Sequence, residues 1–117
     1  MDIRNYFPND EAVLEDLGGG GQRKVVAYHE NLMCVEVHFA QGAVGALHSH
    51  PHEQITYVIS GKFEFDIGGN KKVLGAGDST FKQPNIVHGA VCLEAGTLLD
   101  IFTPHREDFV TQQGAQK

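Results

Sequence analysis

Apolar and polar residues alternate along much of the chain with a period of two. The clearest stretch is 33–39, where Met, Val, Val and Phe occupy the odd positions and Cys, Glu and His the even ones. Successive side chains of a β-strand point to opposite faces, so this pattern predicts a half-buried strand. Stretch 62–67 has the same pattern, with Phe63 and Phe65 on its apolar face.

Similar short stretches predict further strands, and turn residues separate them. The expected strands lie at 25–28, 55–59, 73–74, 79–82, 86–93 and 98–103. Glycines mark several of the connections: Gly18–Gly21 is expected to be a hairpin connection, Ser60-Gly61 to end a strand and Gly68-Gly69-Asn70 to form a turn. No stretch has a helical period. The chain is therefore predicted to be an all-β antiparallel sandwich or barrel, with Val35, Val37, Phe63, Phe65 and Leu98 on its buried faces.

Length and composition indicate one globular domain. The chain has 117 residues, of which 41% are apolar, and it contains 14 glycines. We expect the domain to span 1–110, with an N-terminal arm and Gly-rich loop at 1–21 and a flexible tail at 111–117. The net charge of −6, without a basic cluster, argues against nucleic acid and anionic membranes as partners. The chain has neither a transmembrane run nor a signal-peptide core, so a cytoplasmic protein with free thiols at Cys34 and Cys92 is expected.

Histidines supply the candidate chemistry. His48 and His50 would share one face of a strand, and two neutral imidazoles are half of a first-row metal site. His88, in its own strand-like run, is the expected third ligand. Either Glu53 or Gln54 would be the fourth, because Pro51 interrupts the strand and makes the facing of later side chains uncertain. His52 is expected at the rim, and the role of His105 stays open.

A carboxylate in the last predicted strand is a second candidate. Leu98 and Phe102 share a face with Asp100, and the opposite face is also apolar. A carboxylate in such surroundings is costly to bury unless it is paired, coordinated or protonated. From the residues alone, Asp100 either lies at a solvated strand end or faces the interior beside the metal.

These residues carry a resemblance to a known family. The stretch GAVGALHSHPHEQITYVISG at 42–61 matches the first cupin motif, with Gln54 at the position where most cupins have glutamate. The second cupin motif is present more loosely at 77–92, with Gly77 and His88 in register. More of the chain, including HSHPHEQITYVISGKFEF, PNIVHGAVCLEAG and LLDIFTPHRED, resembles the KdgF-like cupins of pectin degradation.

The resemblance implies a fold and a site. The fold would be a small jelly-roll barrel of two facing antiparallel sheets. The metal ligands would be His48, His50, Gln54 and His88, because the motif register selects Gln54 over Glu53. They would hold one divalent ion among Ni, Zn, Mn, Fe and Co. Three neutral imidazoles and a neutral amide leave the charge of the ion uncompensated, which favours an anionic ligand. Asp100, Phe102 and Arg106 would be the catalytic residues.

The resemblance also implies a function. KdgF-like cupins linearise the small anionic sugars called 4,5-unsaturated monouronates, released from pectin or alginate, in an isomerase or tautomerase type of reaction. Two alternatives stay open: a non-catalytic sugar-binding or sensor cupin, and a metal-dependent cupin oxygenase. A homodimer is expected because small cupins have exposed sheet edges that need covering.

Overall fold

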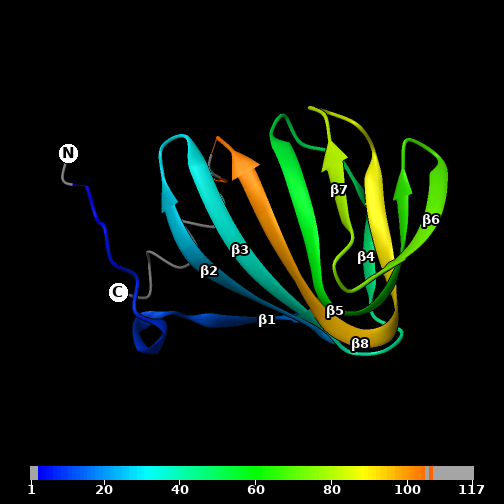
Figure 1. Cartoon of the computed structure of the whole chain (residues 1–117), viewed down its shortest axis with the longest axis horizontal. Helices are drawn as coiled ribbons and strands as arrows, with labels where there is room; N and C mark the ends of the chain where they lie inside the picture. The colour runs from blue at the N-terminus through cyan, green and yellow to red at the C-terminus, as the bar shows by residue number, and fades with distance from the viewer. Residues whose placement is uncertain (1–2, 105, 107–117) are drawn as a thin grey trace.

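The structure, a computed structural model, describes residues 3–104 and 106 and consists almost entirely of antiparallel strands (Figure 1). His105 and the predicted tail at 111–117 lie outside the described residues. A short 3₁₀ helix, η1 (Asn9–Glu11), precedes the strands. Within the described part of the chain, no helix is long and apolar enough to cross a membrane. The strands are β1 (Leu14–Gly18), β2 (Gly21–His29), β3 (Leu32–Phe39), β4 (Val44–His48), β5 (Glu53–Ile67), β6 (Asn70–Gly75), β7 (Ser79–Lys82) and β8 (His88–Thr103).

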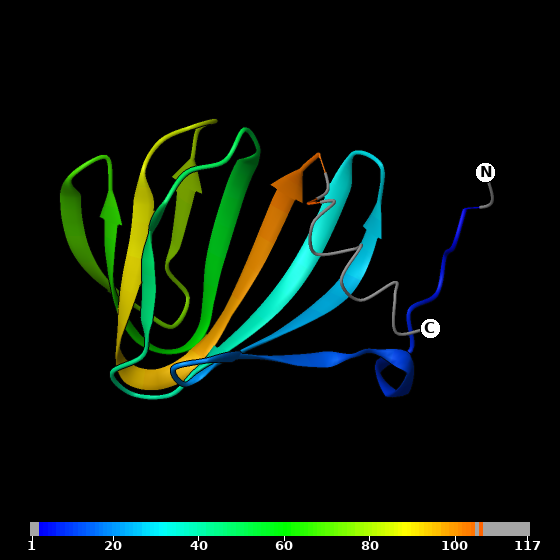
Figure 2. The same cartoon turned by 180° about the vertical axis from the view of Figure 1, so that it is seen from behind.

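Two long strands, β5 and β8, belong to both walls of the fold. The first half of β8 pairs with β4 and with the second half of β5, which also pairs with β6. The second half of β8 pairs with β3 and with the first half of β5, which also pairs with β7. Figure 1 shows β8 passing from yellow beside β4 to orange beside β3, and Figure 2 shows the same two walls from behind. The predicted all-β jelly roll is confirmed, with its two sheets joined through these bent strands.

The structure corrects the strand boundary predicted at Ser60-Gly61. β5 continues through these residues, and its pairing with β8 shifts register three times between Val58 and Phe63. Such β-bulges bend a strand and change which side chains face inward. Before the bulge Thr56 and Val58 are buried, and after it Phe63 and Phe65 are. The inward positions thus change from even to odd numbers. β8 likewise joins two strands predicted separately, at 86–93 and 98–103.

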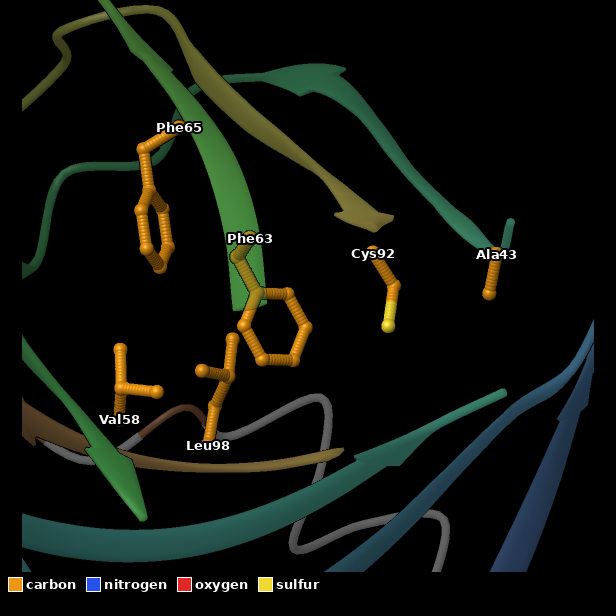
Figure 3. Close-up of a cluster of buried hydrophobic side chains, with 6 residues drawn as sticks. All are labelled: Ala43, Val58, Phe63, Phe65, Cys92 and Leu98. Carbon is orange, nitrogen blue, oxygen red and sulfur yellow. The ribbon is translucent and has the colours of Figure 1, made fainter. Parts of the chain in front are cut away.

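The apolar core lies in two clusters. One contains Ala43, Val58, Phe63, Phe65, Cys92 and Leu98 (Figure 3). The other contains Val25, Met33, Val35, Val37 and Phe102. All five residues predicted for the buried faces are buried, with Phe63 and Val35 fully enclosed. Cys92 packs inside the first cluster and Cys34 is half-buried, and both are free thiols.

Gly61 allows β5 and β8 to approach closely at the bulge. Its φ is +86°, and a Cβ there would lie 2.6 Å from the Glu94 carbonyl oxygen and 2.7 Å from Gly96 Cα. Gly69 has a similar φ of +88°, but no atom lies within 4 Å of where its Cβ would be. Comparing substitutions at the two glycines therefore separates the energetic cost of the backbone conformation from that of the close contact.

We expect Gly61→Ala to lower the free energy of unfolding by about 2–5 kcal/mol, because a left-handed conformation costs about 1–2 kcal/mol and a backbone clash about 1–3 kcal/mol. Gly69→Ala should cost only the first of these amounts. Urea unfolding of both variants measures the difference. Equal losses in the two variants would show that the approach of β5 and β8 at Gly61 is not a steric requirement.

Candidate metal centre and cavity

Three histidines come together where β4 and β8 meet. His48 and His88 are directly paired across the two strands. The ring centroids lie 4.4 Å apart for His48 and His88, 4.9 Å for His50 and His88, and 5.6 Å for His48 and His50. One ring nitrogen from each residue lies within 4.8 Å of the others, a spacing that can hold a metal ion. His50 and His88 are buried, whereas His48 is exposed.

His50 reaches this cluster from a loop and not from the strand that the sequence predicts. β4 ends at His48, and His50 lies two residues beyond its end. Pro51 lacks a backbone N–H and disfavours a helical conformation at the residue before it, so the chain leaves the ladder here. The Asn85 N–H donates to the His50 carbonyl at 2.8 Å and ties the loop to the segment before β8. The position of His50 beside the other histidines is therefore set by the loop and not by the alternation of side chains along a strand.

Backbone carbonyls fix the orientation of two of the imidazoles. His48 Nδ1 lies 2.8 Å from the Ala46 carbonyl oxygen, and His88 Nδ1 lies 2.9 Å from that of Ile86. Each Nδ1 must donate, because a carbonyl can only accept, and the proton-free Nε2 is left for a ligand. Burial lowers the pKa of His88 to about 4, and burial also lowers the pKa of His50. The buried imidazoles are therefore neutral at pH 7, as metal ligands are.

Two buried nitrogens in this cluster have no hydrogen-bond partner among the described residues: His88 Nε2 and His50 Nδ1. Buried polar atoms are rarely left unsatisfied, so such atoms call for an explanation. A bound cation would account for His88 Nε2, since ligand nitrogens of His48, His50 and His88 lie within 4.8 Å of one another. The residues present fit a divalent transition metal.

Gln54 is the residue after Pro51 that faces the histidines. Glu53 is exposed, whereas Gln54 is only 6% exposed. Gln54 Oε1 lies 3.0 Å from His50 Nε2. Two ligands at about 2.1 Å from an ion and at right angles to each other would be about 3 Å apart. The spacing thus suits adjacent ligand atoms, and the side chain of Glu53 points away from them.

The other candidate donors lie outside the group of three. The His52 ring is 5.3 Å from His50 and 6.3 Å from Phe102, which places it beside the cluster. His38, on β3, contacts Glu36 of the same strand and Thr97 of β8, and His29 is exposed at the end of β2. The Cys92 thiol donates to the Glu94 carbonyl oxygen at 3.1 Å within the apolar core.

A cavity of about 250 Å³ opens beside the histidines, between the two walls. Its size suits a small ligand rather than a polymer chain. Every predicted site residue except His50 lines it: His48, Gln54, His88, Asp100, Phe102 and Arg106. Phe102 is 2% exposed, and the Arg106 guanidinium carbon lies 5.5 Å from the centre of its ring. A cation and an apolar ring therefore stand together at the cavity wall.

Asp100 faces the cavity from β8 and is hydrogen-bonded within it. Thr56 Oγ1 donates to Asp100 Oδ1 at 2.6 Å. Burial raises the pKa of the Asp100 carboxyl above its ordinary value, and the nearby Lys82 ammonium and hydrogen bonds from Thr56 and Gln54 oppose this rise. A raised pKa favours the protonated form of this carboxyl, which is the form that can donate a proton.

Thr56 and Lys82 are site residues that the sequence analysis missed. Lys82 is 3% exposed, and its Nζ donates to Thr56 Oγ1 at 2.7 Å and to Thr80 Oγ1 at 2.8 Å. Burial lowers the pKa of Lys82 to about 8, which Asp100 partly counteracts. β7 therefore faces opposite to what polarity alone would predict: its lysine points inward, and its Phe81 is 55% exposed. The sequence did contain a signal for Thr56: Gln54 and Thr56 are polar residues at alternate positions of β5, on the same face as the buried Val58.

An antiparallel barrel that gathers three imidazoles beside a cavity is the arrangement of a cupin. The model of the cupin domain matches residues 35–102, and the chain belongs to the cupin family, in its KdgF-like branch. It is 46% identical over 110 residues to the pectin degradation protein KdgF of Dickeya dadantii, covering 92% of this chain and all of that protein.

Solved structures agree with this relationship. An RmlC-like cupin from Shewanella frigidimarina superposes with a TM-score of 0.87 at 43% identity, over 94% of this chain and all of the other. KdgF from a Halomonas species superposes with a TM-score of 0.85 at 41% identity, over 92% of this chain and 99% of the other. The predicted resemblance to KdgF-like cupins is confirmed.

Proposed function

We propose that this cupin converts 4,5-unsaturated monouronates, the small products of pectin or alginate breakdown, into their open keto-aldehyde form. The observation that carries the proposal is a cavity in which a half-buried carboxyl, Asp100, faces the same space as His48, His88 and Arg106. The 46% identity to a pectin degradation protein supports the substrate class. Both the reaction and the roles of these residues are inferred from this combination.

The reaction requires two proton movements and no oxidant. The substrate ring is a hemiacetal at C1, and its ring oxygen is joined to C5 of the C4=C5 double bond. When the hydroxyl at C1 loses its proton, the C1–ring oxygen bond breaks, C1 becomes an aldehyde and an enolate forms at C5. Protonation at C4 then gives the ketone at C5. One proton leaves oxygen and one reaches carbon, so the step is an isomerisation.

The side chains of the cavity have distinct roles in this proposal. Asp100 exchanges the proton at Oδ2, because its Oδ1 already accepts the Thr56 hydroxyl. Arg106 binds the uronate carboxylate through paired N–H donors. Phe102 gives the sugar ring an apolar surface beside Arg106. His48, His50, His88 and Gln54 would hold one divalent ion, which supplies a positive charge that polarises substrate oxygens.

Incubation of the metal-loaded protein with unsaturated uronate, followed by NMR, tests the function. The vinyl proton signal at C4 should disappear, and signals of the open-chain product should replace it. Binding of the uronate without loss of this signal would instead support the sensor function. Consumption of O₂ during turnover would support the oxygenase. Activity with redox-silent Zn²⁺ is expected for an isomerase and not for an oxygenase.

Arg106→Ala should raise KM by about 10-fold or more and change kcat less, because a charge-assisted bond to a carboxylate contributes about 1.5–3 kcal/mol in ground state and transition state alike. Steady-state kinetics on uronate measures both constants. Arg4→Ala, at an exposed arginine that is not among the residues lining the cavity, is the matched control and should leave both constants close to those of the parent protein. A fall in kcat with an unchanged KM would assign Arg106 a role in the chemical step instead.

We also infer a homodimer. The outer face of β5 and β7 exposes Ile55 (45%), Tyr57 (44%), Ile59 (44%) and Phe81 (55%). Ile55 pairs directly with Phe81, so these side chains form one continuous apolar area. Areas of this kind on a folded protein are typical of interaction surfaces. A second copy would cover this face as well as the sheet edges considered from the sequence.

A further inference from the structure

The buried hydroxyl of Thr56 connects the two halves of the site. Thr56 is 1% exposed, and its Oγ1 takes part in three hydrogen bonds. It accepts from Lys82 Nζ at 2.7 Å and from Gln54 Nε2 at 3.0 Å, and it donates to Asp100 Oδ1 at 2.6 Å. A hydroxyl has one proton and two lone pairs, so this group is fully used.

The direction of these bonds is determined by the charged groups at the two ends. The Lys82 ammonium has only donors, so it must take a lone pair of Thr56 Oγ1. The Thr56 hydroxyl donates to Asp100 Oδ1 at 2.6 Å. The one Thr56 proton is thereby committed to Asp100. Thr56 can then only accept from Gln54.

This direction decides which end of the Gln54 amide faces the histidines. Because Thr56 accepts, the Nε2 end of Gln54 must face Thr56, and the Oε1 end must face His50. An amide oxygen can bind a cation, whereas an amide NH₂ cannot. If the amide were reversed, the NH₂ group would face the three imidazoles, and the fourth donor would be lost.

We propose that Thr56 is a positioning residue, held by Lys82, that orients the Gln54 carbonyl oxygen toward the histidines and holds Asp100 by its Oδ1. The inference rests on the proposed function for the part that concerns Asp100, and it is independent of that function for the part that concerns Gln54. In this scheme Thr56 exchanges no proton with the substrate. Its effect passes through its two neighbours.

Three variants test the proposal. Thr56→Val keeps the branched shape and removes the hydroxyl, whereas Thr56→Ser keeps the hydroxyl. Thr80→Val removes the other hydroxyl that Lys82 contacts and leaves the bonds from Thr56 to Gln54 and Asp100 in place. If Thr56→Val does not fold, Thr56→Cys takes its place, since a thiol is a weak donor and acceptor.

The first measurement is a titration with Co²⁺ in the absence of substrate, in which the absorption spectrum of the bound ion reports binding. Thr56→Val should weaken Co²⁺ binding by about 10–100-fold and alter the spectrum, as loss of a group that orients a ligand does. Thr56→Ser should restore the affinity and the spectrum to within about 3-fold of the parent protein. Thr80→Val should stay in the same range.

The second measurement is turnover of unsaturated uronate at saturating metal. Thr56→Val should lower kcat by about 10–100-fold with little change in KM, and Thr56→Ser should recover it. Unchanged Co²⁺ binding and kcat in Thr56→Val would overturn the inference, and so would equal losses in Thr80→Val. Parent protein that binds Co²⁺ but leaves uronate unchanged would overturn the proposed function, and the cobalt titration would then decide the role of Thr56.

Discussion

Asp100→Asn is expected to lower kcat on unsaturated uronate by about 10²–10⁴-fold, the usual contribution of a general acid or base. The amide is nearly isosteric with the carboxyl, and its Oδ1 can still accept the Thr56 hydroxyl. It cannot exchange a proton at neutral pH, so only the chemical step should suffer. The fold, the metal content and KM should stay close to those of the parent protein.

Three measurements decide the role of Asp100: elemental analysis, thermal unfolding and kinetics on metal-replete protein. Asp16→Asn is a matched control, because Asp16 is exposed in β1, where it accepts the Gly18 N–H, and is not among the residues lining the cavity. If Asp100 only braces its neighbours, Asp100→Asn would lose metal or stability together with activity. Turnover near that of the parent protein would remove Asp100 from the mechanism.

His88→Ala is expected to abolish metal retention, with affinity falling by about 100-fold or more, since even residues that only orient ligands contribute about 10–100-fold. His88 Nε2 has no hydrogen-bond partner among the described residues, so its removal breaks only the Nδ1 bond to Ile86. That bond contributes about 1 kcal/mol, and the apoprotein should therefore remain folded.

Elemental analysis after dialysis and titration with Co²⁺ measure this loss, and circular dichroism checks the fold. His29→Ala is the matched control, because His29 is exposed at the end of β2. A His88→Ala protein that keeps one equivalent of metal would exclude His88 as a ligand. The site would then need a donor set other than the three facing imidazoles.

Much of the fold could be predicted because its strands alternate cleanly. Positions 33–39 and 62–67 bury one face against the core, and their apolar residues follow a period of two. The bulge at Ser60-Gly61 could not be recognised in this way, because a glycine after a strand is equally compatible with a turn and with a bulge. Its role as a close contact with Gly96 depends on β8, which is distant in sequence.

The site could be predicted where its residues follow a motif. The register of the cupin motifs selects His48, His50, Gln54 and His88 as one ligand set, and this holds although His50 reaches the cluster from a loop. Lys82 could not be found by hydrophobic alternation, because β7 buries its lysine and exposes Phe81. The partners that make this burial tolerable, Thr56 and Thr80, come from the neighbouring strand and from β7 itself.

The bulge in β5 separates two segments with opposite facing. Before it, Gln54 and Thr56 point inward and Ile55 and Tyr57 outward, whereas Phe63 and Phe65 point inward after it. Since side chains alternate strictly along a strand, moving 53–58 by one residue would exchange these two sets. The cavity would then be lined by isoleucine and tyrosine, and the polar residues would face solvent. The number of residues in the bulge therefore determines which side chains of 53–58 face the cavity. Inserting or deleting one residue there would replace a polar cavity lining with an apolar one, although residues 53–58 themselves would be unchanged.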